Sequence, residues 1–123
     1  MPIAALTYDI IAGHEDDVAE VFRGFRRPPS PDIPGDGNGD APAARILATA
    51  VFIRDDTLVR VIEYEGDLQA VARFMAGQPG VREVERRLKP YLRNPRDTDT
   101  PEGFVRTFNA SLLRCVTHLS VPR

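Results

Sequence analysis

The sequence contains no tryptophan, a single cysteine and a single lysine, and it has no long apolar run. A lone thiol has no partner within the chain, so Cys115 excludes an intramolecular disulfide. No group of cysteines and histidines has the spacing of metal ligands, and the sequence therefore predicts neither a metal site nor a cofactor. Since the N-terminal residues lack both a basic region and an apolar segment, we expect no signal peptide and no membrane span. The default expectation is a cytoplasmic protein.

Excess charge of one sign is also missing. The formal net charge is -2, and of the sixteen basic residues only Lys89 is a lysine. This balance gives no electrostatic attraction to nucleic acid, and no basic tract suggests an anionic membrane. We therefore expect neither nucleic acid nor a membrane among the partners. At 123 residues the chain has the size of one domain with a single core.

The central feature of the sequence is a β-hairpin between residues 45 and 66. Two runs rich in apolar and β-branched residues flank Asp55 and Asp56, which predict a two-residue turn. This turn fixes the register of the two strands. It places Ile53 opposite Leu58, Val51 opposite Arg60, Thr49 opposite Ile62 and Leu47 opposite Tyr64.

Alternation along the strands divides the hairpin into two faces. One face is small and apolar at its centre, and we expect helices to pack on it: Ile46, Ala48, Ala50, Phe52, Val59, Val61 and Glu63. The opposite face is interrupted by Thr49, Arg60 and Tyr64, and we expect it to stay open. A monomer rarely exposes so large an apolar patch, so a homodimer should bury this face and enclose a pocket there. Arg60 is costly to bury without a partner and is either a surface residue or the functional group of that pocket.

The elements around the hairpin follow from periodicity and capping signals. The sequence predicts a strand at 4–11 and helices at 14–27, 68–77, 81–88 and from 100 onward. Five charged residues of the helix at 81–88 are expected to face solvent: Arg82, Glu83, Glu85, Arg86 and Arg87. Residues 113–121 are interpreted as the last strand, although a continued helix also fits. The order is that of an α+β, ferredoxin-like split β-α-β domain (βαββαβ) of the dimeric α/β-barrel type.

Residues 28–42 form a segment rich in turn-forming residues. They include five prolines and three glycines in fifteen residues. Such a composition buries too little apolar surface to order itself. We therefore expect one domain over residues 1–123 with a flexible loop at 28–42, either a tolerated insertion or a lid.

Three segments carry a resemblance to a known family: FIRDDTLVRVIEYEGD, AGQPGVREVERRLKPYL and FNASLLRC. They resemble the SchA/CurD-like family, which is found in spore-pigment and aromatic polyketide gene clusters. The resemblance runs from about residue 4 to residue 121 without the proline-rich loop. It rests on whole segments and contains no catalytic signature, so it implies a pathway more than a reaction.

The chain is also distantly similar to the small polyketide cyclases of tetracenomycin type. Those enzymes use a histidine in the second hairpin strand, a position that falls on Arg60 here, and a polar pair that falls near Phe25 and Arg26. An arginine cannot act as a general base near neutral pH. Any cyclase chemistry in this chain should therefore differ in detail from that of the resembling enzymes.

The candidate catalytic residues are Arg60, His118 and Tyr64. Arg60 could stabilise an enolate or phenolate, or it could form a salt bridge to Glu63 of a neighbouring chain. His118 is a candidate base if the last strand exists, and otherwise a surface histidine. Tyr64 could orient a carbonyl or relay a proton, or simply close the end of the sheet.

The candidate substrate-binding residues are Tyr8, Arg26, Thr49, Val51 and Ile62. Tyr8 has the same two interpretations as Tyr64. Arg26 is either at the pocket mouth or only complements the dipole at a helix end. The other three residues share a face with Arg60 in the predicted register.

Three functions remain open at this point. The first is a cofactor-free cyclase that folds an aromatic polyketide intermediate, because intramolecular ring closure needs mainly positioning. The second is a cofactor-independent monooxygenase that oxidises an anthrone-type phenol, against which the lack of tryptophan counts slightly. The third is a non-catalytic partner that binds the intermediate. The partners considered are an aromatic polyketide intermediate and a second copy of the chain, and a transient contact with polyketide synthase components is left open.

Overall fold

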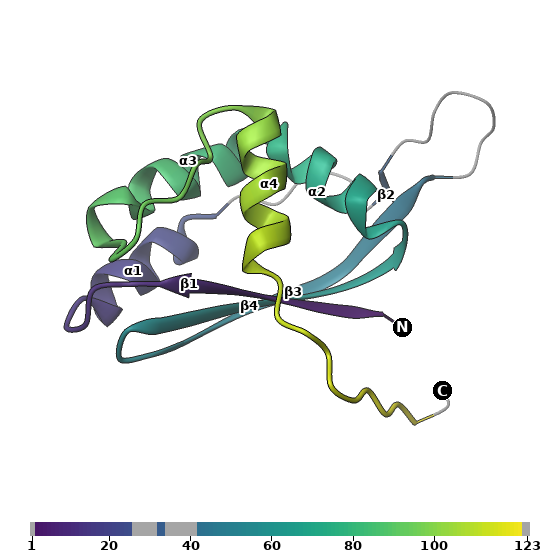
Figure 1. Ribbon diagram of the computed structural model, residues 1–123, viewed down its shortest axis with the longest axis horizontal. Coiled ribbons are helices and arrows are strands. Elements are labelled where there is room, and N and C mark those ends of the chain that lie inside the picture. The colour runs from purple at the N-terminus through teal and green to yellow at the C-terminus, as the bar shows by residue number, and fades with distance from the viewer. Residues whose placement is uncertain (1, 26–31, 34–41, 122–123) are drawn as a thin grey trace.

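A computed structural model describes residues 2–25, 32–33 and 42–121 of the chain (Figure 1). Its strands form one antiparallel sheet in the order β1-β4-β3-β2. The strands are β1 (Ile3–Asp9), β2 (Asp32–Ile33), β3 (Ala44–Arg54) and β4 (Thr57–Gly66). The helices are α1 (Glu15–Arg23), α2 (Leu68–Ala76), α3 (Pro79–Leu88) and α4 (Pro101–Ser111), with a 3-10 turn η1 (Lys89–Tyr91) after α3.

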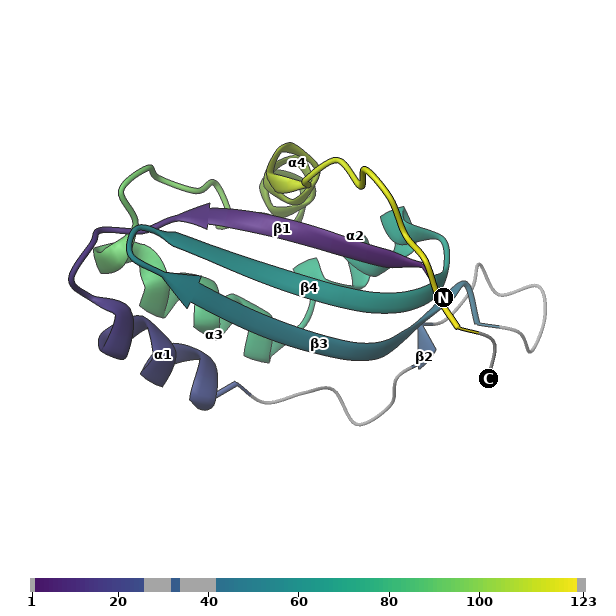
Figure 2. The same cartoon turned by 90° about the horizontal axis from the view of Figure 1, so that it is seen from below.

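All four helices lie on one side of the curled sheet, and the other side stays open (Figures 1 and 2). β1 and the β3–β4 hairpin keep the antiparallel order of a ferredoxin-like sheet, with β4 in the centre. This arrangement confirms the predicted α+β, ferredoxin-like class. None of the helices in the described parts of the chain is long and apolar enough to cross a membrane.

The predicted last strand at 113–121 is wrong, and so is the alternative of a continued helix. Helix α4 ends at Ser111 because Leu112 turns extended, with ψ at 130°. The chain touches the free edge of β1 once, where the Leu113 amide donates to the Ala5 carbonyl at 2.8 Å. Beyond it the segment extends away without regular structure, and Val116 and Leu119 are 83% and 91% exposed. The apolar residues at 113–121 alternate only loosely with polar ones, so the segment has no apolar face that could pack against the sheet.

The hairpin register is confirmed over most of its length. Ile53 pairs with Leu58, Val51 with Arg60 and Thr49 with Ile62, and Asp55 takes the left-handed conformation with φ at 53°. The predicted pair of Leu47 and Tyr64 is wrong. Tyr64 faces Ile46 instead, because a bulge between Ile46 and Ala48 takes Leu47 out of the ladder.

The assignment of the two hairpin faces is also wrong. The helices cover the face of Leu58, Arg60 and Ile62, which are 1%, 5% and 0% exposed. The open face carries the small residues, and its Phe52 is 61% exposed. The small size of the alanines was the basis of the prediction, but burial of the larger leucine and isoleucine side chains removes more apolar area from water. Thr49 and Arg60, which were expected to line a pocket at a dimer interface, therefore face the helices and not the open side of the sheet.

In the segment at 28–42 the structure describes residues 32–33 and 42, and residues 28–31 and 34–41 lie outside the described residues. Asp32 and Ile33 form β2 on the free edge of β3, opposite Arg45 and Ala44. Ile33 is 4% exposed and belongs to the hydrophobic core. The proline- and glycine-rich composition gave no signal for the burial of Ile33.

The helix boundaries follow the capping signals. The Asp67 carboxylate accepts a hydrogen bond from the Gln69 amide at 3.0 Å, and the Thr100 hydroxyl accepts one from the Gly103 amide at 3.0 Å. Helix α1 ends at Arg23, earlier than predicted, and its buried residues Val18 and Val21 face the sheet. In the resulting layer α1 packs next to β3 and α3, and α4 packs next to β1.

Candidate functional site

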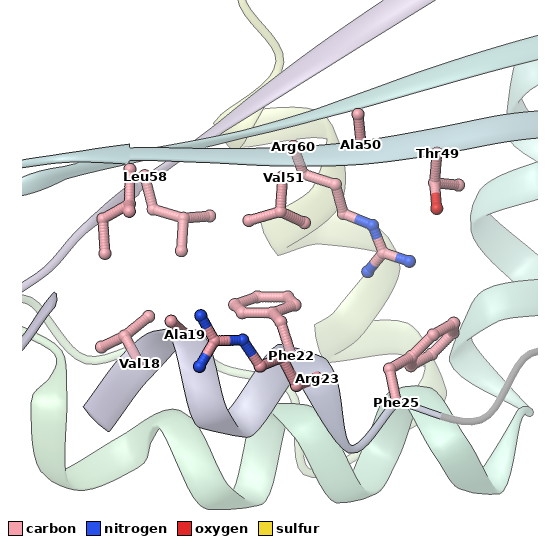
Figure 3. A pocket seen from close by; sticks show the side chains of 11 residues that line it. Val18, Ala19, Phe22, Arg23, Phe25, Thr49, Ala50, Val51, Leu58 and Arg60 are labelled. Atoms are coloured by element: carbon pink, nitrogen blue, oxygen red, sulfur yellow. The ribbon is translucent and has the colours of Figure 1, made fainter. Parts of the chain in front are cut away.

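A pocket of about 400 Å³ lies between α1 and the helix-covered face of the β3–β4 hairpin (Figure 3). Its walls are mainly apolar and come from two parts of the chain: Val18, Phe22 and Phe25 from α1 and the residues after it, and Val51, Ile53 and Leu58 from the hairpin. Arg23, Thr49 and Arg60 supply the polar groups of the lining. Among the described residues that line the pocket, none is a carboxylate or a histidine.

Arg60 is the distinctive group of this pocket. It stands in the middle of β4, is only 5% exposed, and projects from the sheet towards the pocket (Figure 3). Its Nε is buried and has no hydrogen-bond partner among the described residues, and its Cζ lies 5.4 Å from the ring centre of Phe25. A buried cation with an unused donor is unfavourable unless a ligand oxygen or water completes it. Glu63 is no partner within the chain, because it points to the open face of the sheet.

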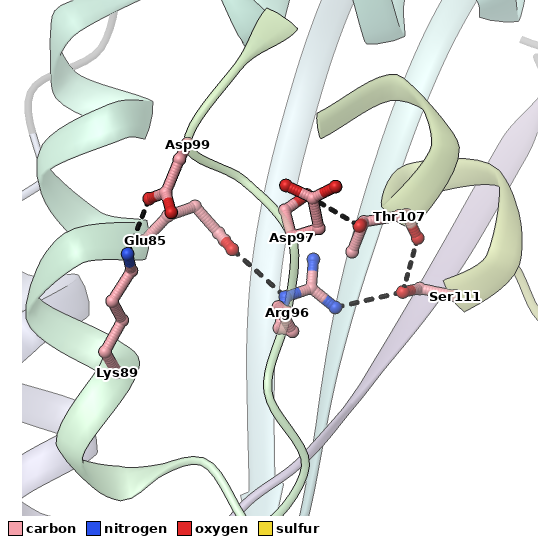
Figure 4. A network of polar contacts seen from close by, with 7 residues as sticks. All are labelled: Glu85, Lys89, Arg96, Asp97, Asp99, Thr107 and Ser111. Carbon is pink, nitrogen blue, oxygen red and sulfur yellow. Dashed lines mark hydrogen bonds and ion pairs between the residues drawn. The ribbon is translucent and has the colours of Figure 1, made fainter. Parts of the chain in front are cut away.

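A second largely buried arginine, Arg96, has a carboxylate and a hydroxyl as partners (Figure 4). Arg96 pairs with Glu85 through Nε and Oε1 at 3.0 Å, and the two side chains are 10% and 3% exposed. Its other end donates to the Ser111 hydroxyl at 2.9 Å, which in turn donates to the Thr107 carbonyl at 2.7 Å. This ion pair joins α3, the connection after it and α4.

Tyr8 connects the two arginines. The Arg96 guanidinium lies 3.9 Å from the centre of the Tyr8 ring, and that ring stands perpendicular to the ring of Phe22, a wall of the pocket. Burial raises the pKa of the Tyr8 hydroxyl, and Glu85 raises it further. The positive charges of the nearby Arg60 and Arg96 lower it in part. Tyr8 is therefore a neutral hydroxyl at physiological pH.

The structure brings together the predicted residues of the hairpin and separates the others. Thr49 and Val51 line the pocket with Arg60. Tyr8 and Ile62 lie on the same side of the sheet and are buried in the core beside it. That these five residues share one face of the sheet follows from the alternation of side chains along the strands.

The remaining predicted site residues are elsewhere. Tyr64 is half-buried, packs against the core and does not line the pocket. His118 is exposed in the irregular C-terminal segment, so the strand that would have made it a candidate base does not exist. Arg26 lies outside the described residues. Phe25, the residue before Arg26, is part of the pocket wall.

Two residues of the site region were not predicted. Glu85 was assigned to solvent, but it is 3% exposed. Its position was a usable signal, since Val81, Val84, Glu85 and Leu88 follow the i, i+3, i+4, i+7 spacing of a buried helix face. Arg96 lies in a polar connection without periodicity, and nothing in the sequence distinguishes it from its neighbours.

The fold and the site together define an α+β, ferredoxin-like domain with an apolar pocket under its helices and a buried cation in it. The chain belongs to the SchA/CurD-like family, because the model of the SchA/CurD like domain matches residues 1–121. It is 36% identical over 118 residues to the "42.8 kDa protein in whiE locus" of Streptomyces coelicolor, covering 96% of this chain and 28% of that protein. It is 35% identical over 116 residues to "Polyketide synthase CurD" of Streptomyces cyaneus, covering 94% and 29%.

A third relative, "Protein SchA" of Streptomyces halstedii, is 34% identical over 115 residues, covering 94% of this chain and 28% of that protein. The chain thus spans less than a third of the length of these relatives. Among solved structures it is similar to tetracenomycin F2 cyclase from Streptomyces glaucescens, described as a type-II polyketide cyclase. The TM-score is 0.56 at 17% identity, covering 99% of this chain and 100% of that one. At this identity the likeness concerns the fold alone.

Proposed function

We propose that this domain is a cofactor-free cyclase that acts on an aromatic (type II) polyketide intermediate in pigment or antibiotic biosynthesis. The family supports the pathway, and the pocket supports the kind of chemistry. The observation that carries the proposal is Arg60, a buried cation with a free Nε in an otherwise apolar pocket.

Cyclisation of a poly-β-ketone passes through an enolate, and the enolate oxygen is the anion that Arg60 would receive. The carbon of one enolate attacks a ketone carbonyl elsewhere in the same chain, and the alkoxide formed takes up a proton. Hydrogen bonding and charge from a preorganised guanidinium stabilise the enolate oxygen more than the neutral ketone. Arg60 therefore lowers the cost of forming the nucleophile.

The pocket supplies no base of its own, since its described lining has no carboxylate and no histidine. A methylene between two carbonyls is already acidic, and a neighbouring guanidinium makes it more so. The proton can then pass to water at the pocket mouth. The apolar walls around Phe22 and Phe25 hold the folded chain, and ring closure within one molecule depends mainly on such positioning.

A cofactor-independent monooxygenase acting on an anthrone-type phenol is the second candidate. The same cation would stabilise a phenolate, and the apolar walls around Val18 and Val51 would admit dioxygen. A non-catalytic domain that binds the intermediate for the synthase would use the same pocket without turnover.

Incubation of the purified protein with the synthase-generated intermediate, with and without oxygen, separates these functions. The proposal predicts that a new ring forms at the same rate in both atmospheres. An oxidised product that forms only with oxygen would establish the monooxygenase instead. If the product distribution is the same as without the protein, the domain is not an enzyme for this intermediate.

A further inference from the structure

The pocket has two arginines in its described lining, and they come from opposite walls (Figure 3). Arg60 belongs to β4 and is 5% exposed, so it lies at the floor of the pocket. Arg23 belongs to the last turn of α1, and its side chain is 71% exposed, so it lies at the mouth. No acid among the described lining residues offsets these two charges. A ligand that enters the pocket therefore meets one cation at the mouth and a second at the floor.

Arg23 has hydrogen-bond donors to spare. Within the described part of the chain its ion pair is to Glu20 on the same helix, and it uses Nη1, which lies 2.6 Å from the Glu20 Oε1. A guanidinium has five N–H donors, so most of them remain for another acceptor. Both partners are largely exposed, and such a pair contributes little to stability. A second carboxylate can therefore bind Arg23 beside Glu20 or replace Glu20 at little cost.

The position of Arg23 at the end of α1 is not a sufficient account of this residue. A basic side chain is favourable near the carbonyl end of any helix, wherever the side chain points. Arg23, however, is part of the pocket lining together with Phe22, Phe25 and Val51. The two roles differ in what they predict, because only a residue that contacts the ligand discriminates between ligands of the same shape.

We propose that Arg23 is a specificity-determining residue that binds a free carboxylate of the ligand at the pocket mouth. The inference rests on the proposed function, since it takes the enolate or phenolate oxygen at Arg60 as the other end of the ligand. It narrows the substrate class to an acid that carries an enol or a phenol at one end and a carboxylate at the other. An amide, ester or thioester of that acid has no negative charge at the mouth and loses the contact with Arg23.

The test compares two probes of nearly equal shape, 4,5-dihydroxyanthraquinone-2-carboxylate and its primary amide. The pocket volume of about 400 Å³ is in the usual range of small-molecule sites. Isothermal titration calorimetry at neutral pH measures the dissociation constant of each probe. We expect the wild-type protein to bind the carboxylate about fivefold more tightly than the amide. This preference should shrink as the salt concentration rises, because the mouth is open to solvent.

Arg23→Met removes the charge at the mouth, and it should bind both probes with the affinity that the wild-type protein has for the amide. Arg23→Lys keeps the charge and should retain part of the preference. Arg106→Met is the matched control, because Arg106 on α4 is 70% exposed, pairs with the exposed Asp97 at 3.1 Å and does not line the pocket. It changes the net charge equally and should behave as wild type. Arg60→Met should weaken the binding of both probes alike.

The outcomes separate this inference from the proposed function. Equal affinities of the wild-type protein for the two probes, or a preference that survives in Arg23→Met, would overturn the role of Arg23 and leave that of Arg60 intact. So would an equal loss of preference in Arg23→Met and Arg106→Met, because the effect would then come from net charge. If Arg60→Met binds both probes as the wild-type protein does, Arg60 receives no anion, and the proposed function loses its carrying observation. Absence of saturable binding of both probes to the wild-type protein would contradict both claims.

Discussion

Arg60 and Arg96 are both largely buried among the described residues, but their surroundings differ. Arg96 has a carboxylate, a hydroxyl and an aromatic face as partners, so it is an integral part of the fold. Arg60 has an aromatic neighbour and a free Nε. The contrast identifies Arg96 as a structural cation and Arg60 as the cation that is available to a ligand.

The structural role of Arg96 leads to a stability prediction. Glu85→Leu would leave a buried guanidinium without its counter-charge, and we expect a loss of about 3–5 kcal/mol in the free energy of unfolding. The double variant Glu85→Leu/Arg96→Leu should recover much of that loss, because no uncompensated charge remains. Urea unfolding monitored by circular dichroism measures both values.

Glu83→Leu is the control for this cycle, since it removes an acid of the same helix whose ion pair with Arg86 is exposed. Its effect on stability should be small. Equal losses of stability for Glu83→Leu and Glu85→Leu would contradict this prediction. So would a double variant that is no more stable than Glu85→Leu, because the loss would then not come from the unpaired charge of Arg96.

At the scale of elements, the sequence predicts best what depends on neighbouring residues. The turn at Asp55 and Asp56 fixes the hairpin register, and the caps at Asp67 and Thr100 fix two helix starts. From the register alone Arg60 falls beside Val51 and on one face with Thr49, which is the part of the site that was predicted. These features need only local geometry.

What the sequence did not predict depends on packing between distant segments. The choice of helix-covered face depends on which side chains fill the space under α1 and α3, and both faces of the hairpin are apolar enough to be covered. The pair of Glu85 and Arg96 joins a helix to a later connection, and neither residue alone signals the other. The last predicted strand failed because β-prone residues at 113–121 find no buried face.

Strand β2 is short, but we predict that it contributes to the stability of the fold. Ile33 is the only apolar side chain of that strand, and it is 4% exposed in the core. Ile33→Ala should therefore lower the free energy of unfolding by about 2–5 kcal/mol, as expected for a large-to-small change in a core. Thermal or urea unfolding measures the loss.

The control is Ile11→Ala, because Ile11 is 40% exposed and its truncation should cost much less. Similar, small effects of the two substitutions would show that β2 contributes little to the fold and that residues 28–42 behave as the freely tolerated insertion that the composition predicts.

At the scale of the whole molecule, the open sheet face is the surface that remains to be covered. A row of small apolar residues crosses it, with Val61 of β4 between Ala5 of β1 and Ala50 of β3, and Phe52 stands exposed beyond that row. An apolar sheet face of this kind is a usual site of association. We therefore keep the prediction of a homodimer, now through this face, with each pocket contained within one chain.

Val61→Arg places a charge at the centre of that row and should convert the dimer to a monomer while the pocket stays formed. Light scattering measures the assembly state, with Ala110→Arg on the exposed side of α4 as the control for added charge. A wild-type protein that is monomeric at micromolar concentration, or a Val61→Arg variant that remains dimeric, would contradict the prediction.

The central claim of this account is that Arg60 receives the oxyanion of a polyketide intermediate, and Arg60→Met tests it most directly. Methionine keeps much of the volume and removes the charge, so the buried unpaired donor disappears. We predict that the melting temperature stays the same or rises, while the rate of ring closure on the synthase-generated intermediate falls at least tenfold. Full turnover in a normally folded variant would contradict the claim, and loss of folding together with turnover would make Arg60 a structural residue.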